Sequence, residues 1–358
     1  MSINKHSEEF KVISLFSGVG GLDIGFGGDC VVHVNSLEEK NKKYIEKPHN
    51  IPDFVFLKPR NFEVIFQNDI LKNVKCLYEQ NFKRSNYNNK SIYDLINSNY
   101  IFPDADVIIG GFPCQDFSHC GKRSGFSSTK SHNLTDEITD TNSRGTLYKA
   151  FVHVVKQVKP KVFIAENVKG LLTMPENPID IIVKEFSNLG YYVKYSLIKL
   201  EKFGVPQTRH RVIIIGVLKT AEIPYENWHL VNDLNNAECP VKFYLNHLQE
   251  PSETTDLSQQ SYSKAKKLTK GQGQKIIDIN GFAPTVRAEH HGNIEFRNEK
   301  RRLTIREVGL IQTFSPDFIF NNSVNLTSYK FIGNAVPPLL SFFLAVKTEE
   351  LLTYFPKN

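Results

Sequence analysis

The sequence lacks most of the features that mark proteins of membranes, of the cell exterior or of structural metal sites. It contains no run of about 18 apolar residues, so a membrane-spanning helix is not expected. Its first residues, MSINKHSEEFKV, include no long apolar segment, so a secretory signal is not expected either. The five cysteines form no CxxC pair, which argues against a disulfide framework or a zinc site, and we assign no metal. These absences predict a protein of the reducing cytoplasm.

The length exceeds that of one ordinary domain, and the charge balance is mildly basic. The chain has 358 residues, so we expect one large domain together with a smaller one. Hydrophobic residues make up 40% and charged residues 23% of the chain, as in folded soluble proteins. The net charge of +6 suits an anionic partner but is too small to identify one.

Short apolar segments alternate with helix-like stretches through the first part of the chain. Strands are expected at residues 11–16, 30–35, 63–69, 106–112, 161–167, 194–200 and 209–218. This alternation predicts an α/β fold with a doubly wound, mostly parallel sheet of seven strands, covered by helices on both faces. The last two strands are separated by a short segment and are therefore expected to pair as an antiparallel hairpin.

The pattern changes near residue 218, which predicts a domain boundary. Residues 219–300 are polar, irregular and rich in Asn, Gln, Ser and Gly, and we place a second, smaller domain there. Residues 304–313 are expected to be helical, and residues 329–355 to form one long helix with an apolar stripe. The predicted organisation is a first domain at 1–218, a second at 219–300, and a segment at 301–358 that returns to the first.

A glycine-rich turn, SLFSGVGGLDIGF at 14–26, joins the first expected strand to a helix. Such a turn exposes backbone N–H groups at a helix N-terminus, which suits an anionic group. Asp23 stands where a dinucleotide fingerprint has its third glycine, so a tight turn without a ligand remains an open interpretation. Phe16, just before the turn, can stack on a flat ring.

Acidic residues follow the second and third expected strands. Glu38 or Glu39 can receive ribose hydroxyls, as acidic residues at this place do in doubly wound folds, or can simply begin a helix. Asp69 and Ile70 can hold an adenine through a carboxylate and an aliphatic face, although Asp69 is also a suitable helix N-cap.

The stretch GGFPCQDFSHCGKR at 110–123 places Cys114 after Pro113, at the carboxyl end of a predicted strand. A thiolate nucleophile needs partial exposure and electropositive surroundings. Nearby His119, Lys122 and Arg123 can provide the positive charge. A structural cysteine is the alternative interpretation.

Further polar residues are expected at the same edge of the sheet. Glu166 follows the apolar run VFIA, where it can hydrogen-bond or protonate a ring nitrogen, or form a structural ion pair. Arg209 and Arg211 share one face of a strand and can hold a phosphate, or form a solvated strand end. A basic cluster suits a DNA phosphate track or a solvent face, and it comprises Arg287, Arg297, Lys300, Arg301, Arg302 and Arg306.

The order of these elements resembles the motif set of the DNA (cytosine-5) methyltransferases of bacterial restriction–modification systems. The matching elements are LFSGVGG, ND, GGFPCQDFS, RGTL, ENVKGL, QTRHR, REVGLIQTF and YKFIGNAVPP. The resemblance extends over residues 11–345 and is weakest in 219–265. It implies the S-adenosylmethionine-dependent methyltransferase fold, which is Rossmann-like, and a target-recognition domain at 219–300.

The resemblance implies an S-adenosylmethionine site, with S-adenosylhomocysteine as the product. The residues expected to line it are Phe16, Ser17, Gly18, Gly20, Gly21, Leu22, Glu38, Asp69, Ile70, Pro113, Asn334 and Ala335. The family has an acidic residue directly after the Asn that ends strand two. Here Ser36 follows Asn35, so the ribose ligand is either Ser36 or Glu38, and we choose Glu38.

The resemblance also implies catalytic and DNA-binding roles. Cys114 is the expected nucleophile, Glu166 engages N3 and the amino group of the cytosine, and Arg211 holds the flipped nucleotide with Arg209 nearby. The expected DNA contacts are Gln115, Ser118 and Lys122 in a loop that closes on DNA, and Gln272, Lys275, Thr285 and Arg287 in the recognition region. Gln272 is expected to fill the gap left by the flipped base.

The predicted function is methyl transfer to C5 of a flipped cytosine in a short duplex DNA sequence. The expected protein is a monomer in the bacterial cytoplasm, associated with the nucleoid when bound to DNA, without membrane or metal. A restriction endonuclease is expected to act on the same site without a stable complex. The alternatives are an RNA cytosine-5 methyltransferase, a DNA-binding regulator without catalysis and a nicotinamide-dependent oxidoreductase.

Overall fold

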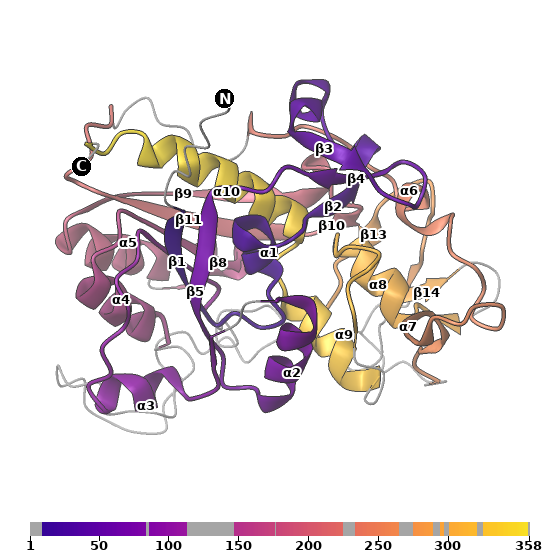
Figure 1. Ribbon diagram of the computed structural model, residues 1–358, viewed down its shortest axis with the longest axis horizontal. Coiled ribbons are helices and arrows are strands. Elements are labelled where there is room, and N and C mark those ends of the chain that lie inside the picture. Colours follow the sequence, from indigo (N-terminus) through magenta and orange to yellow (C-terminus); the bar gives the residue numbers. More distant parts are fainter. Residues whose placement is uncertain are drawn as a thin grey trace, which may run out of the picture.

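Seven strands form the central sheet of the computed structural model, in the order β6-β5-β1-β7-β8-β11-β9 (Figure 1). Their bounds are β1 Phe10–Leu15, β5 Phe62–Asn68, β6 Tyr87–Asn88, β7 Val107–Gly110, β8 Val162–Val168, β9 Tyr191–Lys199 and β11 His210–Leu218. Neighbouring strands are parallel, except that β11 runs antiparallel to both β8 and β9. The predicted mostly parallel, doubly wound sheet and its terminal hairpin are therefore confirmed.

The structure describes most of the chain in nine stretches. These are residues 9–83, 86–112, 147–175, 177–224, 233–264, 275–288, 294–296, 301–320 and 325–356.

Helices cover both faces of the sheet, because its central strands are apolar on both sides. Ile109 and Ile164 contact one buried cluster, while their neighbours Ile108 and Phe163 contact another. The first face carries α1 (Gly21–Gly27), α2 (Lys72–Asn81) and α10 (Pro338–Leu352). The second carries α3 (Ile92–Asn97), α4 (Leu147–Val158) and α5 (Pro178–Asn188). Sheets buried on both faces in this way are typical of parallel strands.

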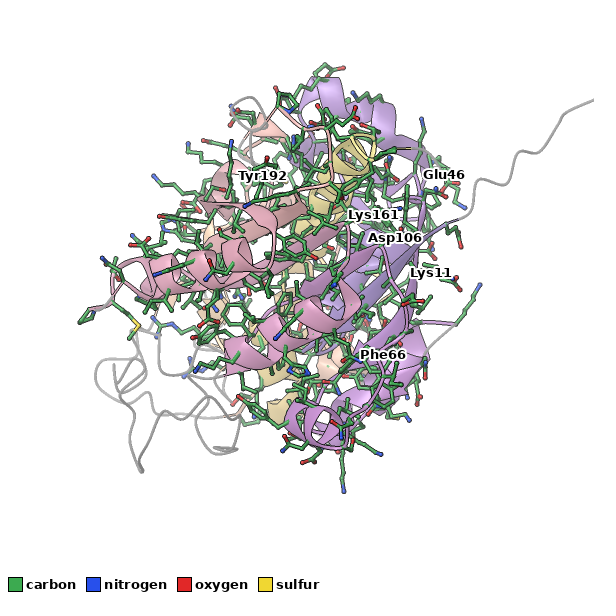
Figure 2. The ribbon with its side chains drawn as sticks, turned by 90° about the vertical axis from the view of Figure 1, so that its left-hand side faces the viewer. Lys11, Glu46, Phe66, Asp106, Lys161 and Tyr192 are labelled. Carbon is green, nitrogen blue, oxygen red and sulfur yellow. The ribbon has the colours of Figure 1, made fainter. Side chains whose placement is uncertain are left out.

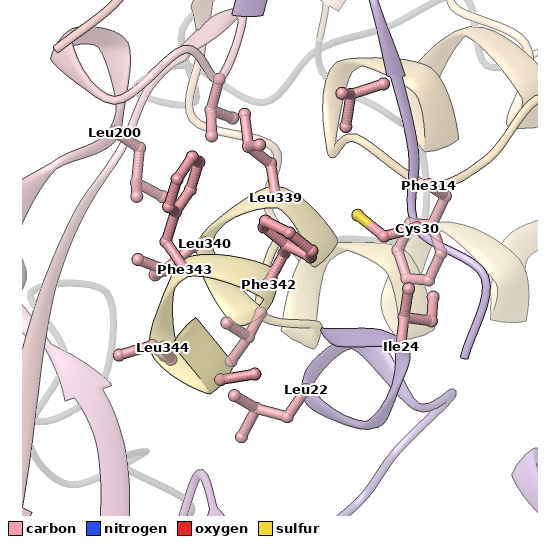
Figure 3. Packing of buried hydrophobic residues seen from close by; sticks show 14 of the residues in the cluster. Leu22, Ile24, Cys30, Leu200, Phe314, Leu339, Leu340, Phe342, Phe343 and Leu344 are labelled. Atoms are coloured by element: carbon pink, nitrogen blue, oxygen red, sulfur yellow. The ribbon is translucent and has the colours of Figure 1, made fainter. Parts of the chain in front are cut away.

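The last part of the chain forms two helices, and α10 packs against α1 and β8. Figure 3 shows Leu339, Leu340 and Phe342 of α10 in the same buried cluster as Leu22 of α1. Helix α9 (Asn325–Asn334) is separated from α10 by residues that include Pro337, because proline cannot continue a helix and restricts the residue before it. The expected single helix is therefore wrong. By length and composition alone, the stretch Thr327–Leu352 could cross a membrane, but 83% of its apolar window is buried inside the protein.

The predicted second strand does not belong to the central sheet. Strand β2 (Val31–His33) pairs with β4 (Phe54–Leu57), which pairs with β3 (Ile45–Pro48) in a small antiparallel sheet. Strand β5 lies next to β1 in its place. An apolar run of a few residues predicts a strand but not its partner. The prediction that residues 30–35 belong to the central sheet is therefore wrong.

Short elements form the region after β11. They are α6 (Lys242–Leu245), α7 (Leu257–Gln260), β12 (Lys275–Ile276), β13 (Ala283–Pro284), β14 (Ile294–Phe296), β15 (Arg301–Arg302) and α8 (Ile305–Ile311), while β10 (Gln207–Thr208) lies just before β11. Thr304 and Glu307 form a capping box that begins α8 within the predicted helix. The pairing of β10 with β13 connects this region to the segment that precedes β11.

One end of the sheet is closed by charged side chains. Lys11, Asp106 and Lys161 lie together there (Figure 2), before β7 and β8 begin. The Asp106 carboxylate accepts a hydrogen bond from the Lys11 backbone at 3.0 Å and pairs with the Lys161 ammonium at 2.9 Å. The candidate site lies at the other end, where the parallel strands finish.

Candidate active site

The carboxyl ends of four adjacent strands bring most of the described candidate residues together. The glycine turn follows β1, Asp69 follows β5, Gly111 follows β7, and Glu166 lies near the end of β8. Open parallel sheets bind their ligands at this edge, because the loops there diverge to opposite faces.

The glycine turn begins with a strained residue. Phe16 adopts a left-handed backbone with φ 55°, a conformation that is rare for a bulky side chain and costs on the order of 1–3 kcal/mol. Gly18 and Gly20 follow with φ 54° and 85°. Ser17 and Leu22 are buried and hold the turn in place rather than pointing outward, and the Ser17 hydroxyl donates to the Ser14 carbonyl at 2.9 Å.

Asp69 fixes the turn from the neighbouring strand. Its carboxylate accepts a hydrogen bond from the Gly18 N–H at 3.1 Å and another from the Leu71 N–H at 2.9 Å. Burial raises the pKa of Asp69, and these backbone donors together with the charge of Lys330 offset part of that shift. Ile70 beside it is 63% exposed, which leaves an aliphatic surface free.

These residues fit an adenosine group. Among the described residues the space beside Gly18 is open, since a Cβ built there would meet none of their atoms within 4 Å. A Cβ on Gly21 would lie 2.3 Å from the Val336 carbonyl, so residues 334–336 pass directly beside the turn. Asn334 is exposed and Ala335 half-buried.

Glu38 and Ser36 lie away from this edge. Glu38 pairs with Lys40 at 3.1 Å, and its carboxylate accepts the Asn236 N–H at 3.1 Å. The Ser36 hydroxyl shares a hydrogen bond of 2.8 Å with Tyr244. Both follow β2, which is not in the central sheet, so the structure does not support the predicted ribose role of either residue. Asp69 directly follows Asn68, the last residue of β5, which lies beside β1. An acidic residue directly after a strand-ending Asn is the family's pattern for the ribose ligand, so the pair Asn68-Asp69 was the sequence signal for that role.

Asp23 is a buried carboxyl that the sequence did not single out for a role. It accepts hydrogen bonds from the Ser14 hydroxyl at 2.5 Å and from the Tyr78 hydroxyl at 2.8 Å. The Tyr78 ring stacks on Phe82 with centroids 4.1 Å apart, and Phe82 packs against Gly20. Asp23 therefore connects β1, α1 and α2 next to the glycine turn. Burial raises its pKa to about 6 from 3.8, and the two hydroxyl donors reduce the shift.

Asp23 is expected to make the protein less stable as pH rises from 4 to 6. Below pH 3.8 the carboxyl is protonated in both states, whereas above it the unfolded chain ionises first and is stabilised. Relative to the wild type, Asp23→Asn should therefore gain on the order of 3 kcal/mol in free energy of unfolding between pH 4 and 7. Urea unfolding at several pH values measures this difference. The exposed Asp104 provides the control Asp104→Asn, and a flat difference for Asp23→Asn would contradict the assignment.

Glu166 and Arg211 form an ion pair at the same edge. Glu166 is 8% exposed, and the Arg211 Nε lies 2.7 Å from its Oε1. Arg211 also donates to the His210 carbonyl at 2.8 Å, which fixes the guanidinium. A Cβ on Gly111 would lie 3.1 Å from the Glu166 Oε2, so this second oxygen is directed towards the end of β7, and glycine leaves it room.

The chain that leads to Cys114 is anchored beside Glu166. Phe112 is buried, and the Asn167 side-chain amide donates to the Phe112 carbonyl at 3.4 Å. The Asn167 side-chain oxygen accepts the Val168 N–H at 2.9 Å, which orients the amide. The candidates Pro113, Cys114, Gln115, Ser118 and Lys122 lie outside the described residues.

Arg209 is not available to a nucleotide. It is 1% exposed, and it donates to the carbonyls of Val286 at 2.8 Å, Gly333 at 3.0 Å and Ala335 at 3.3 Å. The prediction that it assists Arg211 at the flipped nucleotide is therefore wrong. Alternation along the strand predicted a shared face, but residue 209 lies between β10 and β11, where the strand pattern is interrupted.

The expected DNA contacts are only partly described. Thr285 is half-buried and donates to the Thr208 carbonyl at 2.5 Å, and Arg287 is exposed. Lys275 belongs to β12, whereas Gln272 lies outside the described residues. Within the basic cluster, Arg301 and Arg306 are enclosed and form the ion pairs Arg301–Glu307 at 2.9 Å and Arg306–Asp256 at 3.0 Å. These two arginines therefore stabilise the fold and do not form a phosphate track.

Known proteins match this chain over most of its length. Residues 54–350 match the family described as C-5 cytosine-specific DNA methylase. Type II methyltransferase M.NgoFVII of Neisseria gonorrhoeae is 30% identical, covering 94% of this chain and 86% of that protein. Type II methyltransferase M.BspRI of Lysinibacillus sphaericus is also 30% identical, covering 99% of this chain and 85% of that protein.

Solved structures resemble the chain in fold. The Entamoeba histolytica methyltransferase EhMeth has a TM-score of 0.63 and 18% identity, covering 97% of this chain and 99% of that one. The S. pombe Dnmt2 methyltransferase has a TM-score of 0.63 and 15% identity, covering 96% of this chain and 99% of that one. The sheet and its helices are those of the C5 methyltransferases, whose fold is Rossmann-like.

Proposed function

Since the chain belongs to the C-5 cytosine-specific DNA methylase family, of the Type II restriction–modification kind, we propose that it methylates C5 of a flipped cytosine in a short, specific duplex DNA sequence. One observation carries the proposed chemistry. The Glu166 carboxylate is held by Arg211 at 2.7 Å with its second oxygen, Oε2, towards the end of β7. Cys114 is two residues beyond Phe112, which Asn167 fixes, and two residues span at most about 7 Å.

The proposed methyl donor is S-adenosylmethionine, which supplies an electrophilic methyl group. Asp69 would accept the ribose hydroxyls, in the role that the sequence gave to Glu38. Ile70 would contact the adenine, and the open side of Gly18 would admit the amino acid part. Asn334 and Ala335 would close the pocket from the other end of the chain. Pro113 would complete it beside Cys114.

The Cys114 thiolate would add to C6 of the cytosine, because C5 of the intact aromatic ring is a poor nucleophile. The new S–C6 bond breaks the aromaticity and gives C5 the character of an enamine carbon. Glu166, in its protonated form, would give its proton to N3 as negative charge develops there, and would take it back when the S–C6 bond breaks. After C5 has taken the methyl group, a base removes the C5 proton, the S–C6 bond breaks and the thiolate is restored.

A cytosine within a duplex is out of reach, so the base must leave the stack at a cost of a few kcal/mol. Arg211 would hold the flipped nucleotide, and Thr285 and Arg287 would contact the backbone. Gln115, Ser118, Lys122, Gln272 and Lys275 remain proposed DNA contacts. Phosphate contacts offset the cost of base flipping.

The remaining proposals concern organisation and partners. The divisions 1–218, 219–300 and 301–358 would separate catalysis, target recognition and the returning segment. The protein would act as a metal-independent monomer on DNA in the bacterial cytoplasm and nucleoid. A cognate restriction endonuclease would cut the same unmethylated site without binding the methyltransferase stably.

The position of the transferred methyl group tests the proposal. The enzyme would be incubated with labelled S-adenosylmethionine and duplex DNA, and the labelled nucleoside identified. Label on 5-methylcytosine within one short sequence is expected. Label on N4 of cytosine or N6 of adenine would reject the proposal, as would transfer to RNA but not to DNA.

Asp69→Ala is expected to weaken S-adenosylmethionine binding roughly tenfold to a hundredfold. A hydrogen bond to a charged group contributes about 1.5–3 kcal/mol, and removing the carboxylate also releases Gly18. Calorimetric titration measures the dissociation constant Kd. The matched control is Glu38→Ala, which should leave Kd unchanged because Glu38 contacts Lys40 and Asn236 instead. A larger effect for Glu38→Ala than for Asp69→Ala would reverse the assignment.

A further inference from the structure

Arg209 connects segments that are far apart in the sequence. One guanidinium nitrogen, Nη1, donates to Val286 in the recognition region, and the other, Nη2, donates to Gly333 and Ala335 beside the glycine turn. Arg209 lies between β10 and β11, directly before the strand that carries Arg211. Its planar fork therefore holds three parts of the chain in one arrangement.

Two buried glutamines extend this connection. The Gln207 side chain accepts the Val286 N–H at 3.2 Å and donates to Gln312 at 2.5 Å. Gln312 in turn donates to the carbonyls of Ile332 at 3.1 Å and Ala335 at 2.5 Å. Both glutamines are fully enclosed, where a hydrogen bond that is lost is not replaced by water. The backbone at 286 is thus tied to the backbone at 332–335 by a continuous chain of hydrogen bonds.

The two tied segments are also in direct contact. A Cβ on Gly333 would lie 2.3 Å from the Arg287 carbonyl carbon and 2.5 Å from the Ala288 nitrogen. Only glycine leaves room for the backbones to approach this closely. Any shift of residues 333–335 is therefore transmitted to residues 286–288, since packed backbones are stiff.

We propose that Arg209 is a positioning residue that couples binding of the cofactor to binding of DNA. This inference rests on the proposed function, in which Asn334 and Ala335 contact the cofactor while Thr285 and Arg287 contact DNA. A cofactor that orders residues 333–335 also fixes the carbonyls that Arg209 holds, and through them Val286. DNA bound at 285–287 orders the cofactor segment by the same route, because coupling between two ligands is reciprocal.

The test is the ratio of the Kd for DNA without and with saturating S-adenosylhomocysteine. The DNA is a duplex that the wild-type enzyme methylates. Couplings of this kind are typically 5- to 150-fold, and a ratio of about tenfold or more is expected for the wild type. Arg209→Lys keeps the charge but loses the planar fork, so its ratio should fall to within about twofold of one. Partial unfolding would not imitate this fall, because S-adenosylhomocysteine stabilises the folded state and would raise the apparent ratio of a partly unfolded variant.

Arg306→Lys is the matched control. Arg306 is also a buried arginine, but its hydrogen-bond partners in the described part of the chain are Asp256 and the Phe318 carbonyl, not residues 332–335. It should keep the wild-type ratio. If Arg209→Lys does not fold, Gln312→Met removes the donors to Ile332 and Ala335 at similar volume, and it too should lower the ratio.

Three results would overturn the inference: a wild-type ratio near one, a wild-type ratio in both Arg209→Lys and Gln312→Met, or an equal loss in Arg306→Lys. Failure of the proposed function is a separate result. In that case the wild type would transfer no methyl group to cytosine, and no substrate duplex would be available for the measurement.

Discussion

Replacement of Cys114 by alanine is expected to lower the rate of methyl transfer by a factor on the order of 10⁴ or more, as loss of a covalent nucleophile does in other enzymes. Without addition to C6, C5 of the cytosine has no enamine character and cannot attack the methyl group. Glu166 and the bound cytosine remain in place, but methyl transfer to C5 cannot start without the addition to C6. Single-turnover assays with labelled S-adenosylmethionine measure the rate.

Binding should survive this change. Because the proposed role of the thiol is attack on C6 rather than binding of the cofactor or the phosphates, the Kd values for S-adenosylhomocysteine and for the duplex should stay within a few-fold of those of the wild type. Cys76→Ala is the matched control, since Cys76 is exposed on α2, and it should leave the rate unchanged. Turnover that persisted in Cys114→Ala would refute the covalent mechanism.

The second large effect is expected for Glu166→Gln, which should lower kcat by roughly 10²- to 10⁴-fold with little change in KM for DNA. Glutamine has the same length and can still accept a hydrogen bond from Arg211 Nε. It cannot supply a proton or an ionised oxygen when charge develops at N3. The loss therefore falls on the transition state rather than on binding, which separates this role from a structural ion pair.

Glu201→Gln provides the comparison for Glu166→Gln. Glu201 is also largely buried and pairs with His210, the neighbour of Arg211, at 3.1 Å. It follows β9, two strands along the sheet from β8, and its partner is His210 rather than Arg211, so its replacement should leave kcat unchanged. If Glu166→Gln instead raised KM at constant kcat, Glu166 would contribute to binding alone.

Much of the fold was readable from the sequence, because parallel strands leave a strong signal. The runs VIIG and VFIA are apolar on both faces, and the structure buries them at the centre of the sheet. The carboxyl edge followed from this order, and with it the neighbourhood of the glycine turn, Asp69 and Glu166. These features depend on local pattern and on the direction of the chain.

The errors arose where partners are chosen over long distances. Residues 31–33 form a strand, but so short an apolar run does not identify β4 as its partner. Because this strand was assigned to the central sheet, Glu38 was expected at the carboxyl edge of that sheet, where it does not lie. A single helix was predicted over residues 329–355 despite Pro337, because the apolar stripe continues on both sides of this proline.

Arg209 shows a different reason for failure. Its two-residue spacing from Arg211 suggested a shared face, whereas the carbonyls that enclose it come from residues 286, 333 and 335. Buried polar networks of this kind depend on tertiary packing. No local pattern announces them, and the same is true of Asp23 between Ser14 and Tyr78.

The most direct measurement of the central claim is the yield of covalent enzyme–DNA complex on a duplex with 5-fluorocytosine at the methylated position. Fluorine cannot leave as a proton does, so the S–C6 bond should persist after methyl transfer. With S-adenosylmethionine present, the wild type is expected to form a complex that survives denaturing electrophoresis, and Cys114→Ala none. A wild type that turns over normal duplex yet leaves no such complex, or an equal complex with Cys114→Ala, would contradict the assignment of Cys114 as the nucleophile.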